Sequence, residues 1–189
     1  MSRAFLRASL ALWTRRLKYF RRKHNFYHRF SKRPEAERKA LARKWHEHED
    51  RAAYWVVRRR RELDDYASAN FRMSEFNTHD GTPVPTAAHG GVRNLCRLIL
   101  EPMRKQFGAC HVTSGYRHSA YNAKVGGAAK SYHIYDLRPD EPAADVSFAC
   151  GTPAEWAAFA RKLGRGGVGQ YDRSGFVHVD LGPRRNWSG

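Results

Sequence analysis

The stretch that decides the fold is GGVGQYDRSGFVHVDLG, residues Gly166 to Gly182. It contains two short runs rich in valine and aromatic residues, each bounded by glycine, and the turn Arg-Ser-Gly lies between them. Two such runs around a short turn predict an antiparallel β-hairpin. Because side chains alternate along a strand, His178 and Asp180 share one face of the second strand. We therefore expect a small sheet that presents a histidine and a carboxylate on the same side.

Strands and helices are mixed around this hairpin. Thr152, Pro153 and Glu155 form a variant of the capping box, which predicts a helix that starts there. No regular strand–helix–strand alternation is present, so the sequence favours the α+β class, a small antiparallel sheet with flanking helices. The other predicted elements are strands in CHVTSGYR (from Cys110) and AADVSFAC (from Ala143), a helix over Val92–Phe107 ended by Gly108, and a short helix in SAYNAKVGGAAKS (from Ser119).

The first third of the chain has a different texture. Large apolar residues recur every three or four positions over Arg3–Phe30, which predicts an amphipathic helix. Pro34, with Glu35 and Glu37 after it, predicts the start of a second helix that runs to about Tyr66. We expect residues 1–66 to form a basic helical hairpin, residues 67–90 a linker and entry loop, and residues 91–189 the main domain.

The charge is concentrated in this predicted hairpin. The chain has a formal net charge of +17, and residues 1–66 carry 20 Lys and Arg against 8 Asp and Glu, a net of +12. Such an excess indicates a polyanionic partner: nucleic acid, an anionic wall polymer or a membrane surface. Aromatic residues between the arginines, such as Trp13 and Phe26, could stack on bases, although at helical spacing they are more often packed inside.

Three other local patterns give weaker indications of function. The segment His46–Asp50, HEHED, resembles a metal box, but on a helix residues two apart face in different directions, so we interpret it as a polar helix face. Cys96, Cys110 and Cys150 form no CxxC pair, which argues against a zinc knuckle or a disulfide scaffold. The N-terminal apolar patch is too short and too charged for a secretory signal or a membrane span. We therefore expect synthesis in the cytoplasm without an export signal.

Three residues are candidate metal ligands. His133 lies in a loop before a predicted strand, Asp145 begins that strand, and His178 lies within the last strand. Two imidazoles and one carboxylate leave a fourth tetrahedral position for water, which is typical of catalytic zinc. Spacing alone leaves a second interpretation open: a turn histidine, a strand carboxylate and a partly buried strand histidine.

The order of several segments resembles the zinc peptidase family M15. These segments are FNTHDGTPVP, LCRLILEPMRKQFG, VTSGYRHSAYNAKVGGAAKSYH, AADV and GVGQYDRSGFVHVDLGPRRNW, which together span about residues 71 to 189. The resemblance points to the branch of D-alanyl-D-alanine carboxypeptidase-like and peptidoglycan endopeptidase proteins. The basic N-terminal region is similar to those attached to this domain in some bacteriophage endolysins.

The resemblance implies a ligand set for one Zn²⁺ per chain. The family's SxH matches Ser131 and His133, its AxD matches Asp145, and the histidine of the C-terminal strand is His178. It also implies that the arginine of SGYR, Arg117, contacts the substrate.

Further residues are expected around this ligand set. Tyr116 and Ser131 are candidates for the polar lining, with packing as the alternative. Arg185 and Trp187 match the family's closing RxW, which we expect to lock the C-terminus.

The sequence departs from the family pattern in two places. Asp145 follows His133 by twelve positions rather than by about seven, and the inserted loop contains the rival ligands Asp136 and Asp140. Asp145 is preferred because it alone stands in the AxD context. The usual position of the general base, three residues before His178, is Gly175. Two carboxylates remain as candidates for the base, Asp172 and Asp180, and Asp180 could instead orient a ligand imidazole.

Taken together, the residues and the resemblance predict a zinc metallopeptidase of peptidoglycan, a D,D-carboxypeptidase or an endopeptidase. It would act as a monomer at the bacterial cell wall after release from the host cytoplasm, with the basic hairpin bound to anionic wall polymers. Two alternatives remain: a nucleic-acid-binding or virion structural protein with an inactive peptidase-like domain, and a cytoplasmic dipeptide hydrolase.

Overall fold

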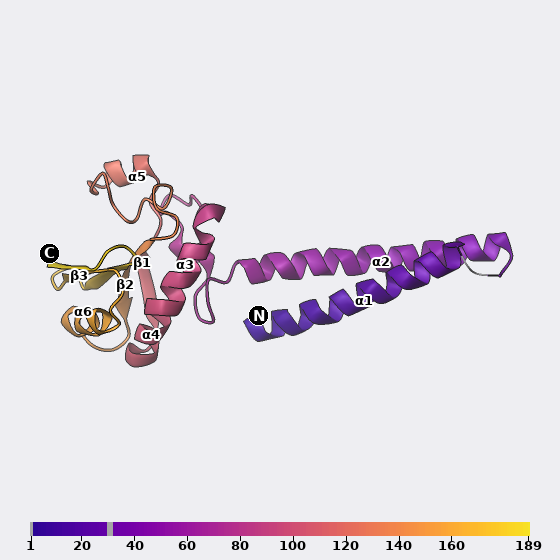
Figure 1. Cartoon of the computed structure of the whole chain (residues 1–189), viewed down its shortest axis with the longest axis horizontal. Helices are drawn as coiled ribbons and strands as arrows, with labels where there is room; N and C mark the ends of the chain where they lie inside the picture. The colour runs from indigo at the N-terminus through magenta and orange to yellow at the C-terminus, as the bar shows by residue number, and fades with distance from the viewer. Residues whose placement is uncertain (1, 30–31) are drawn as a thin grey trace. The chain divides into compact units, whose positions relative to one another are not determined.

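The computed structural model of the chain describes residues 2–29 and 32–189 and divides them into two compact units. The hairpin unit comprises residues 1–65, and the sheet unit comprises residues 66–189 (Figure 1). Among the described residues, no helix combines the length and the apolar character that crossing a membrane requires.

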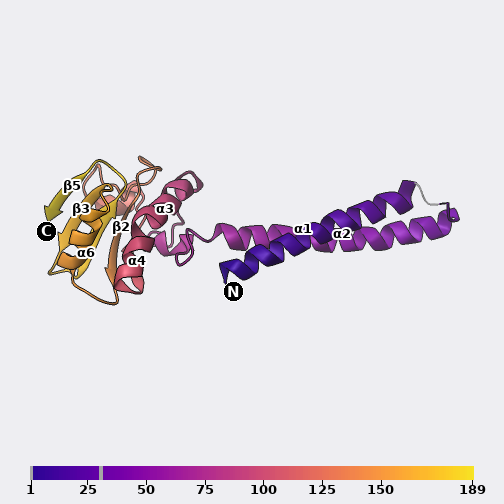
Figure 2. The same cartoon turned by 60° about the horizontal axis from the view of Figure 1, so that its bottom comes forward.

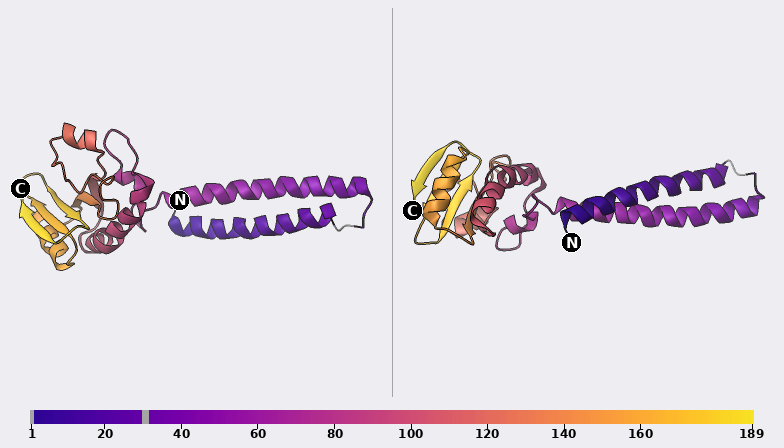
Figure 3. Two further views of the ribbon diagram at one scale, coloured as in Figure 1. Left: turned by 45° about the horizontal axis from the view of Figure 1, so that its top comes forward. Right: turned by 90° about the horizontal axis from the view of Figure 1, so that it is seen from below.

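Two long helices form the hairpin unit. Helix α1 spans Arg3–Arg29 and helix α2 spans Glu35–Asp64, and they lie side by side in every view (Figures 1–3). Pro34 precedes the first turn of α2, and acidic residues in that turn complement the helix dipole. Stacked aromatic rings hold the pair together, including Trp13 on Trp55 with centroids 5.7 Å apart. The predicted end of the first helix, Phe30, lies outside the described residues.

A polar layer lies between the two helices near His46. Its ring is 5.0 Å from that of His24, and Glu49 Oε2 lies 3.2 Å from His24 Nδ1. Arg21 donates to the same carboxylate at 2.8 Å and thereby lowers the pKa of Glu49. His48 points elsewhere and stacks on Phe20. The HEHED segment therefore divides between two faces of α2: His46 and Glu49 meet His24 of α1, where the three donor atoms lie close enough to hold a metal ion, and His48 packs on Phe20.

The segment expected to be a linker is part of the sheet unit's core. It contains two 3₁₀ turns, η1 (Met73–Phe76) and η2 (Thr86–Ala88). Phe71, Phe76 and Val84 are at most 5% exposed and belong to the main hydrophobic cluster. The abundant glycine and proline correctly indicate turns here, but they conceal apolar anchors that keep the segment packed.

The predicted helix over Val92–Phe107 is a broken one. It consists of α3 (His89–Leu95), a π-helical turn η3 (Cys96–Leu100) and α4 (Glu101–Phe107), and it ends at Gly108, whose φ is +83°. The wide turn directly precedes Pro102, which has no N–H to donate and whose ring clashes with an ordinary helical carbonyl four residues earlier. This explains the break at that position.

Five strands form one sheet in the order β1-β2-β4-β3-β5. All pairs are antiparallel except β3 with β5. The α+β prediction is confirmed, including the β3–β4 hairpin and the capping box of Thr152 and Glu155 at the start of α6 (Pro153–Lys162). The strands are β1 (Cys110–Ser114), β2 (Ala143–Phe148), β3 (Gly167–Tyr171), β4 (Phe176–Asp180) and β5 (Arg185–Ser188), and α5 (Ser119–Lys124) follows β1.

The sheet has one packed face and one working face. Val146, Val168, Val177 and Val179 belong to the hydrophobic core, which α6 covers (Figure 2). Alternation turns the residues between these valines to the opposite face. That second face carries the polar side chains described next.

Candidate metal centre

A single row of residues crosses the sheet at the candidate site. Asp145 on β2 pairs with His178 on β4, His178 pairs with Gly169 on β3, and Gly169 pairs with Trp187 on β5. Directly paired residues on neighbouring strands have Cβ atoms about 5 Å apart, close enough for side-chain contact. The register of the sheet therefore brings Asp145 and His178 together across 33 residues of sequence.

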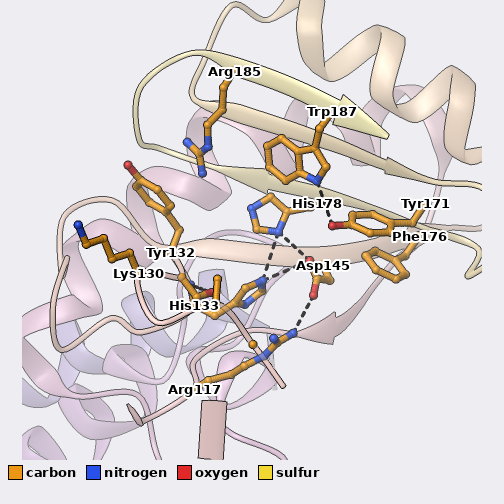
Figure 4. A pocket seen from close by; sticks show the side chains of 13 residues that line it. Arg117, Lys130, Tyr132, His133, Asp145, Tyr171, Phe176, His178, Arg185 and Trp187 are labelled. Atoms are coloured by element: carbon orange, nitrogen blue, oxygen red, sulfur yellow. Dashed lines mark hydrogen bonds and ion pairs between the residues drawn. The ribbon is translucent and has the colours of Figure 1, made fainter. Parts of the chain in front are cut away.

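Three donor atoms converge at this point (Figure 4). His178 Nδ1 lies 2.8 Å from Asp145 Oδ1, and His133 Nε2 lies 3.2 Å from both of these atoms. All three residues are less than 9% exposed. Ligands at tetrahedral positions around zinc, with bonds of 2.0–2.1 Å, stand about 3.3 Å apart. The spacing of these donors fits that geometry.

The outer nitrogen of each imidazole is already engaged. His133 Nδ1 lies 2.6 Å from the carbonyl oxygen of Gly115, and His178 Nε2 lies 3.0 Å from Asp180 Oδ2. Both partners are acceptors, so these nitrogens carry the protons and the inner nitrogens of neutral rings carry lone pairs. Two lone pairs and a carboxylate oxygen within 3.2 Å repel one another unless a proton or a metal cation lies between them. The residues present therefore suit a metal ion.

Burial and charge shift the pKa of each group in the cluster, in different directions for the two histidines. Burial lowers the pKa of His133, despite the opposing charge of Asp145. Burial also opposes protonation of His178, but its hydrogen bonds to Asp145 and Asp180 outweigh that cost and raise its pKa. The pKa of Asp145 lies well below its usual range because its interactions with His133 and His178 outweigh its burial. The cluster thus keeps an ionised carboxylate ready to meet a cation.

Asp180 is saturated with hydrogen bonds. It is 0% exposed, and its Oδ1 accepts from the backbone N–H groups of Gly167 at 3.0 Å and Gly182 at 2.8 Å. Arg185 adds a forked ion pair, at 2.6 Å to Oδ2 and 3.2 Å to Oδ1. His178 also donates to Oδ2, so donors occupy both oxygens of Asp180. Neither oxygen is free to accept a proton from a water in the cavity. Its geometry is that of an orienting partner for the imidazole.

Arg117 holds the other oxygen of the central carboxylate. Its Nη2 donates to Asp145 Oδ2 at 3.0 Å, and Nε and Nη2 both donate to Ser114 Oγ. The guanidinium therefore fixes one oxygen of Asp145 and leaves Oδ1 directed at the histidines. Arg117 also lines the cavity above the cluster, so the same group stands within reach of a ligand.

The two rival carboxylates of the long loop lie elsewhere. Asp136 Oδ2 accepts a hydrogen bond from the Tyr116 hydroxyl at 2.7 Å, and Asp140 lies beside Gly91 of α3. Only Asp145 of the three acidic candidates meets both histidines. Tyr116 itself is 5% exposed and is absent from the cavity lining, so the structure places it in a packing position.

Asp172 stands in the turn between β3 and β4. Its Oδ2 accepts from Gln170 Nε2 at 2.8 Å, and its side chain is exposed and does not line the cavity. The structure thus brings His133, Asp145 and His178 together and leaves Asp172 outside that cluster.

An open cavity of about 460 Å³ covers the cluster (Figure 4). Ser131 lines it as expected, and so do Arg185 and Trp187, for which sequence reasoning expected only a locking role. Sequence reasoning missed the remaining walls. The side chains that it missed are Lys130, Tyr132, Tyr171 and Phe176.

Two glycines of β3 make room for the fifth strand's side chains. A Cβ on Gly169 would stand 2.5 Å from the Trp187 indole, and one on Gly167 would stand 2.5 Å from Asp180 Oδ2. Trp187 therefore lies over bare backbone, its ring 5.1 Å from that of His178, and its Nε1 donates to the Tyr171 hydroxyl at 2.9 Å. The GxG spacing in GVGQY was the available sequence signal for this wall.

Comparison with known proteins identifies relatives of the sheet unit. The chain is 39% identical over 83 residues to a probable peptidoglycan L,D-endopeptidase MepK of Haemophilus influenzae, covering 41% of this chain and 42% of that protein. It is 37% identical over 79 residues to the peptidoglycan L,D-endopeptidase MepK of Escherichia coli K12, covering 39% of this chain and 41% of that protein. The chain thus spans about two fifths of the length of these curated relatives. No solved structure matches it significantly.

A family match covers most of the sheet unit. Residues 67–180 match the model of the Peptidase M15 family. The matched range begins where the buried segment around Phe71 begins and ends at Asp180, so it includes all three converging donor residues. The chain belongs to the Peptidase M15 family.

Proposed function

We propose that the chain is a zinc-dependent endopeptidase that hydrolyses an amide bond in the stem peptide or cross-bridge of peptidoglycan. The observation that carries the proposal is the convergence of His133 Nε2, Asp145 Oδ1 and His178 Nδ1 beneath an open cavity. Membership of the M15 family and the similarity to proteins named peptidoglycan L,D-endopeptidases support the substrate class.

His133, Asp145 and His178 would hold the ion. A zinc ion bound there would polarise the amide carbonyl and lower the pKa of a bound water. Asp180 and the Gly115 carbonyl keep the two imidazoles in the tautomers that present their lone pairs inward. We therefore assign Asp180 a positioning role and not that of general base. Since one chain supplies all of these groups, the proposal needs only a monomer.

The shape of the site favours an endopeptidase over a carboxypeptidase. A second hollow of about 390 Å³ adjoins the first, and both are lined by Arg117, Asp145 and Phe176. Asp145 therefore lies at the border of two open depressions, and His133 and His178 line the first of them. A peptide can continue on both sides of the bond that is cut, whereas a carboxypeptidase needs only one deep side.

Residues of the cavity wall have distinct tasks in this proposal. The Tyr171 hydroxyl accepts from Trp187, which leaves its own proton to donate toward the carbonyl oxygen of the substrate. Lys130 lines the cavity, so its ammonium group suits a carboxylate of the stem peptide. Ser131 and Arg117 complete the polar contacts.

The setting of a bacteriophage endolysin belongs to the same proposal. The enzyme would reach the wall from the host cytoplasm, and the strongly basic hairpin would bind a polyanion there. The excess positive charge of residues 1–66 supports the second part.

Digestion of purified peptidoglycan tests the function directly. The full chain should release peptide-linked fragments whose masses identify the cleaved bond, and a chelator should stop the reaction until Zn²⁺ is returned. Release that continues unchanged after complete metal removal would contradict the metal-dependent mechanism. Release of single terminal D-alanine residues alone would contradict the endopeptidase assignment.

A further inference from the structure

Helix α1 uses one of its heptad-spaced stripes to bind α2. Leu6, Trp13, Phe20 and Tyr27 recur every seven residues along the helix. Leu6 is 3% exposed, and the three aromatic rings stack on tryptophans of α2. These four residues are thus accounted for by the hairpin itself.

A second stripe with the same spacing lies beside this seam and stays half exposed, although Tyr19 meets Trp45 edge-on and Phe5 lies under the Arg59 guanidinium. Phe5, Leu12, Tyr19 and Phe26 are 53%, 48%, 51% and 50% exposed. Seven residues are nearly two turns of helix, so these side chains line up over about 32 Å. Single apolar residues scattered over a protein surface are normal. Four large apolar side chains in one row, each about half exposed to solvent, instead form a contiguous apolar patch. The stripe is a half-exposed apolar face of α1.

Positive charge borders this stripe on both sides. Arg15, Arg22 and Arg29 follow Leu12, Tyr19 and Phe26 by three positions, and Arg16 and Lys23 follow the first two by four positions. Residues three and four apart are neighbours on a helix surface, so every apolar group from Leu12 onward has a cation beside it. Helix α1 contains nine Lys and Arg residues and neither Asp nor Glu.

We propose that this face of α1 lies along the surface of an anionic lipid bilayer. A helix with an apolar row between basic rows binds in the interface, with the apolar row at the acyl boundary and the cations at the headgroups. Each Lys or Arg near an anionic surface contributes about 1 kcal/mol. The helix lies on the membrane and does not cross it, in keeping with the charges of α1.

The arrangement of charged and apolar residues on α1 favours a bilayer over a second copy of the chain, a wall polymer or a nucleic acid. A second copy of the hairpin would bring two helices with nine cations each against one another, without an acidic residue on either. A wall polymer or a nucleic acid matches the charge but offers no apolar phase for Leu12 and Phe5. Only an anionic membrane complements both rows of the face.

Vesicle binding by the full chain tests the proposal. The protein should co-sediment with phosphatidylglycerol vesicles and only weakly with phosphatidylcholine vesicles. Leu12→Ser with Phe26→Ser should weaken binding to the anionic vesicles on the order of tenfold, because the charge is unchanged and only apolar burial is lost. Val57→Ser on α2, at a side chain that is also 50% exposed, is the matched control and should bind as the wild type does. Arg15→Gln with Arg22→Gln should cost roughly fivefold per charge.

Several results would overturn the proposal. One is equal binding of the Leu12/Phe26 variant, which would reduce the interaction to charge alone. Another is tight binding to teichoic acid or DNA together with no binding to anionic vesicles. A third is a lipid-free dimer that the Leu12/Phe26 variant makes monomeric, which would assign the face to a second copy. Helicity measured by circular dichroism separates each result from misfolding, since both substituted positions are exposed.

Discussion

The two units of the chain differ in how they bury their apolar side chains. Among the described residues of the hairpin unit, only Leu6, Ala42, Ala52 and Val56 are buried apolar side chains, and three of the four are small or β-branched. The sheet unit has one continuous core that runs from the entry segment through α6 to the valines of β4. One unit is held by a thin aromatic seam with a charged exterior, and the other by a closed core.

The two kinds of packing suit different tasks: exact positioning of side chains in the sheet unit, and binding to an extended surface in the hairpin unit. The sheet unit positions three donor atoms to within 3.2 Å of one another, which demands a rigid support. The hairpin unit offers long exposed faces, which a binding element needs and a catalytic site does not. Changes in the sheet unit should therefore act on chemistry, and changes in the hairpin unit on location.

The largest expected effect is the loss of one donor of the proposed metal centre. His178→Ala removes Nδ1, one of the three donors of the proposed zinc centre, so zinc retention should fail and hydrolysis should fall by at least about 10⁴-fold. Metal analysis of the purified protein and peptidoglycan digestion measure both quantities. His111→Ala, at an exposed histidine of β1, is the matched control and should leave them unchanged. Full activity in the His178 variant would refute the assigned centre.

Removal of the orienting charge should have an intermediate effect. Asp180→Asn keeps the size of the side chain but weakens the hydrogen bond that sets the tautomer of His178. We expect a loss of about 10–100-fold in zinc affinity. Competition with a calibrated chelator measures this loss.

Saturating zinc separates the two roles that the sequence allows for Asp180. If this carboxylate positions His178, excess zinc should restore most of the activity of Asp180→Asn. A variant that binds zinc normally but remains inactive would instead support Asp180 as the general base.

Adding a side chain at Gly169, the glycine beneath the Trp187 indole, should have a smaller effect. Gly169→Ala would place a methyl group 2.5 Å from the indole, so the cavity wall must shift. Overpacking of this kind costs about 1–3 kcal/mol, which should appear as a lower melting temperature and a higher KM. Gly90→Ala on α3, where a Cβ meets nothing within 4 Å, is the control and should be neutral or slightly stabilising. Trp187→Ala in the Gly169→Ala background should recover the stability lost to the clash.

Local pattern predicted much of this arrangement. Alternation in FVHVD placed His178 and Asp180 on one face, and the capping box placed the start of α6. Strand β5 escaped prediction because its sequence, RNWS, has no apolar alternation. Its position follows from a long-range fit in which the glycines of β3 receive Trp187, and no short window of sequence contains both partners.

Amino-acid composition is a poor guide where long-range packing determines the structure. Residues 67–90 have the glycine and proline content of a linker, yet Phe71 and Phe76 lie in the core, in one hydrophobic cluster with residues of the helices and the sheet. The choice among Asp136, Asp140 and Asp145 was likewise a question of register, since only the pairing of β2 with β4 places one of them opposite His178.

The smallest catalytic effect is expected from damage to the hairpin seam, and it tests the comparison most strictly. Trp55→Ala removes the ring that stacks on Trp13, and truncation of a large aromatic side chain costs up to about 3–5 kcal/mol where the ring is fully buried. The helical signal of the chain should therefore melt at a lower temperature. Hydrolysis of small soluble muropeptides should stay within about twofold of the wild type, because none of the hairpin residues that the structure describes lines either hollow of the site. Activity on intact walls and binding to vesicles should decline together. A comparable loss on small muropeptides would show that the thin seam and the closed core are coupled, and the division between adhesion and chemistry would not hold.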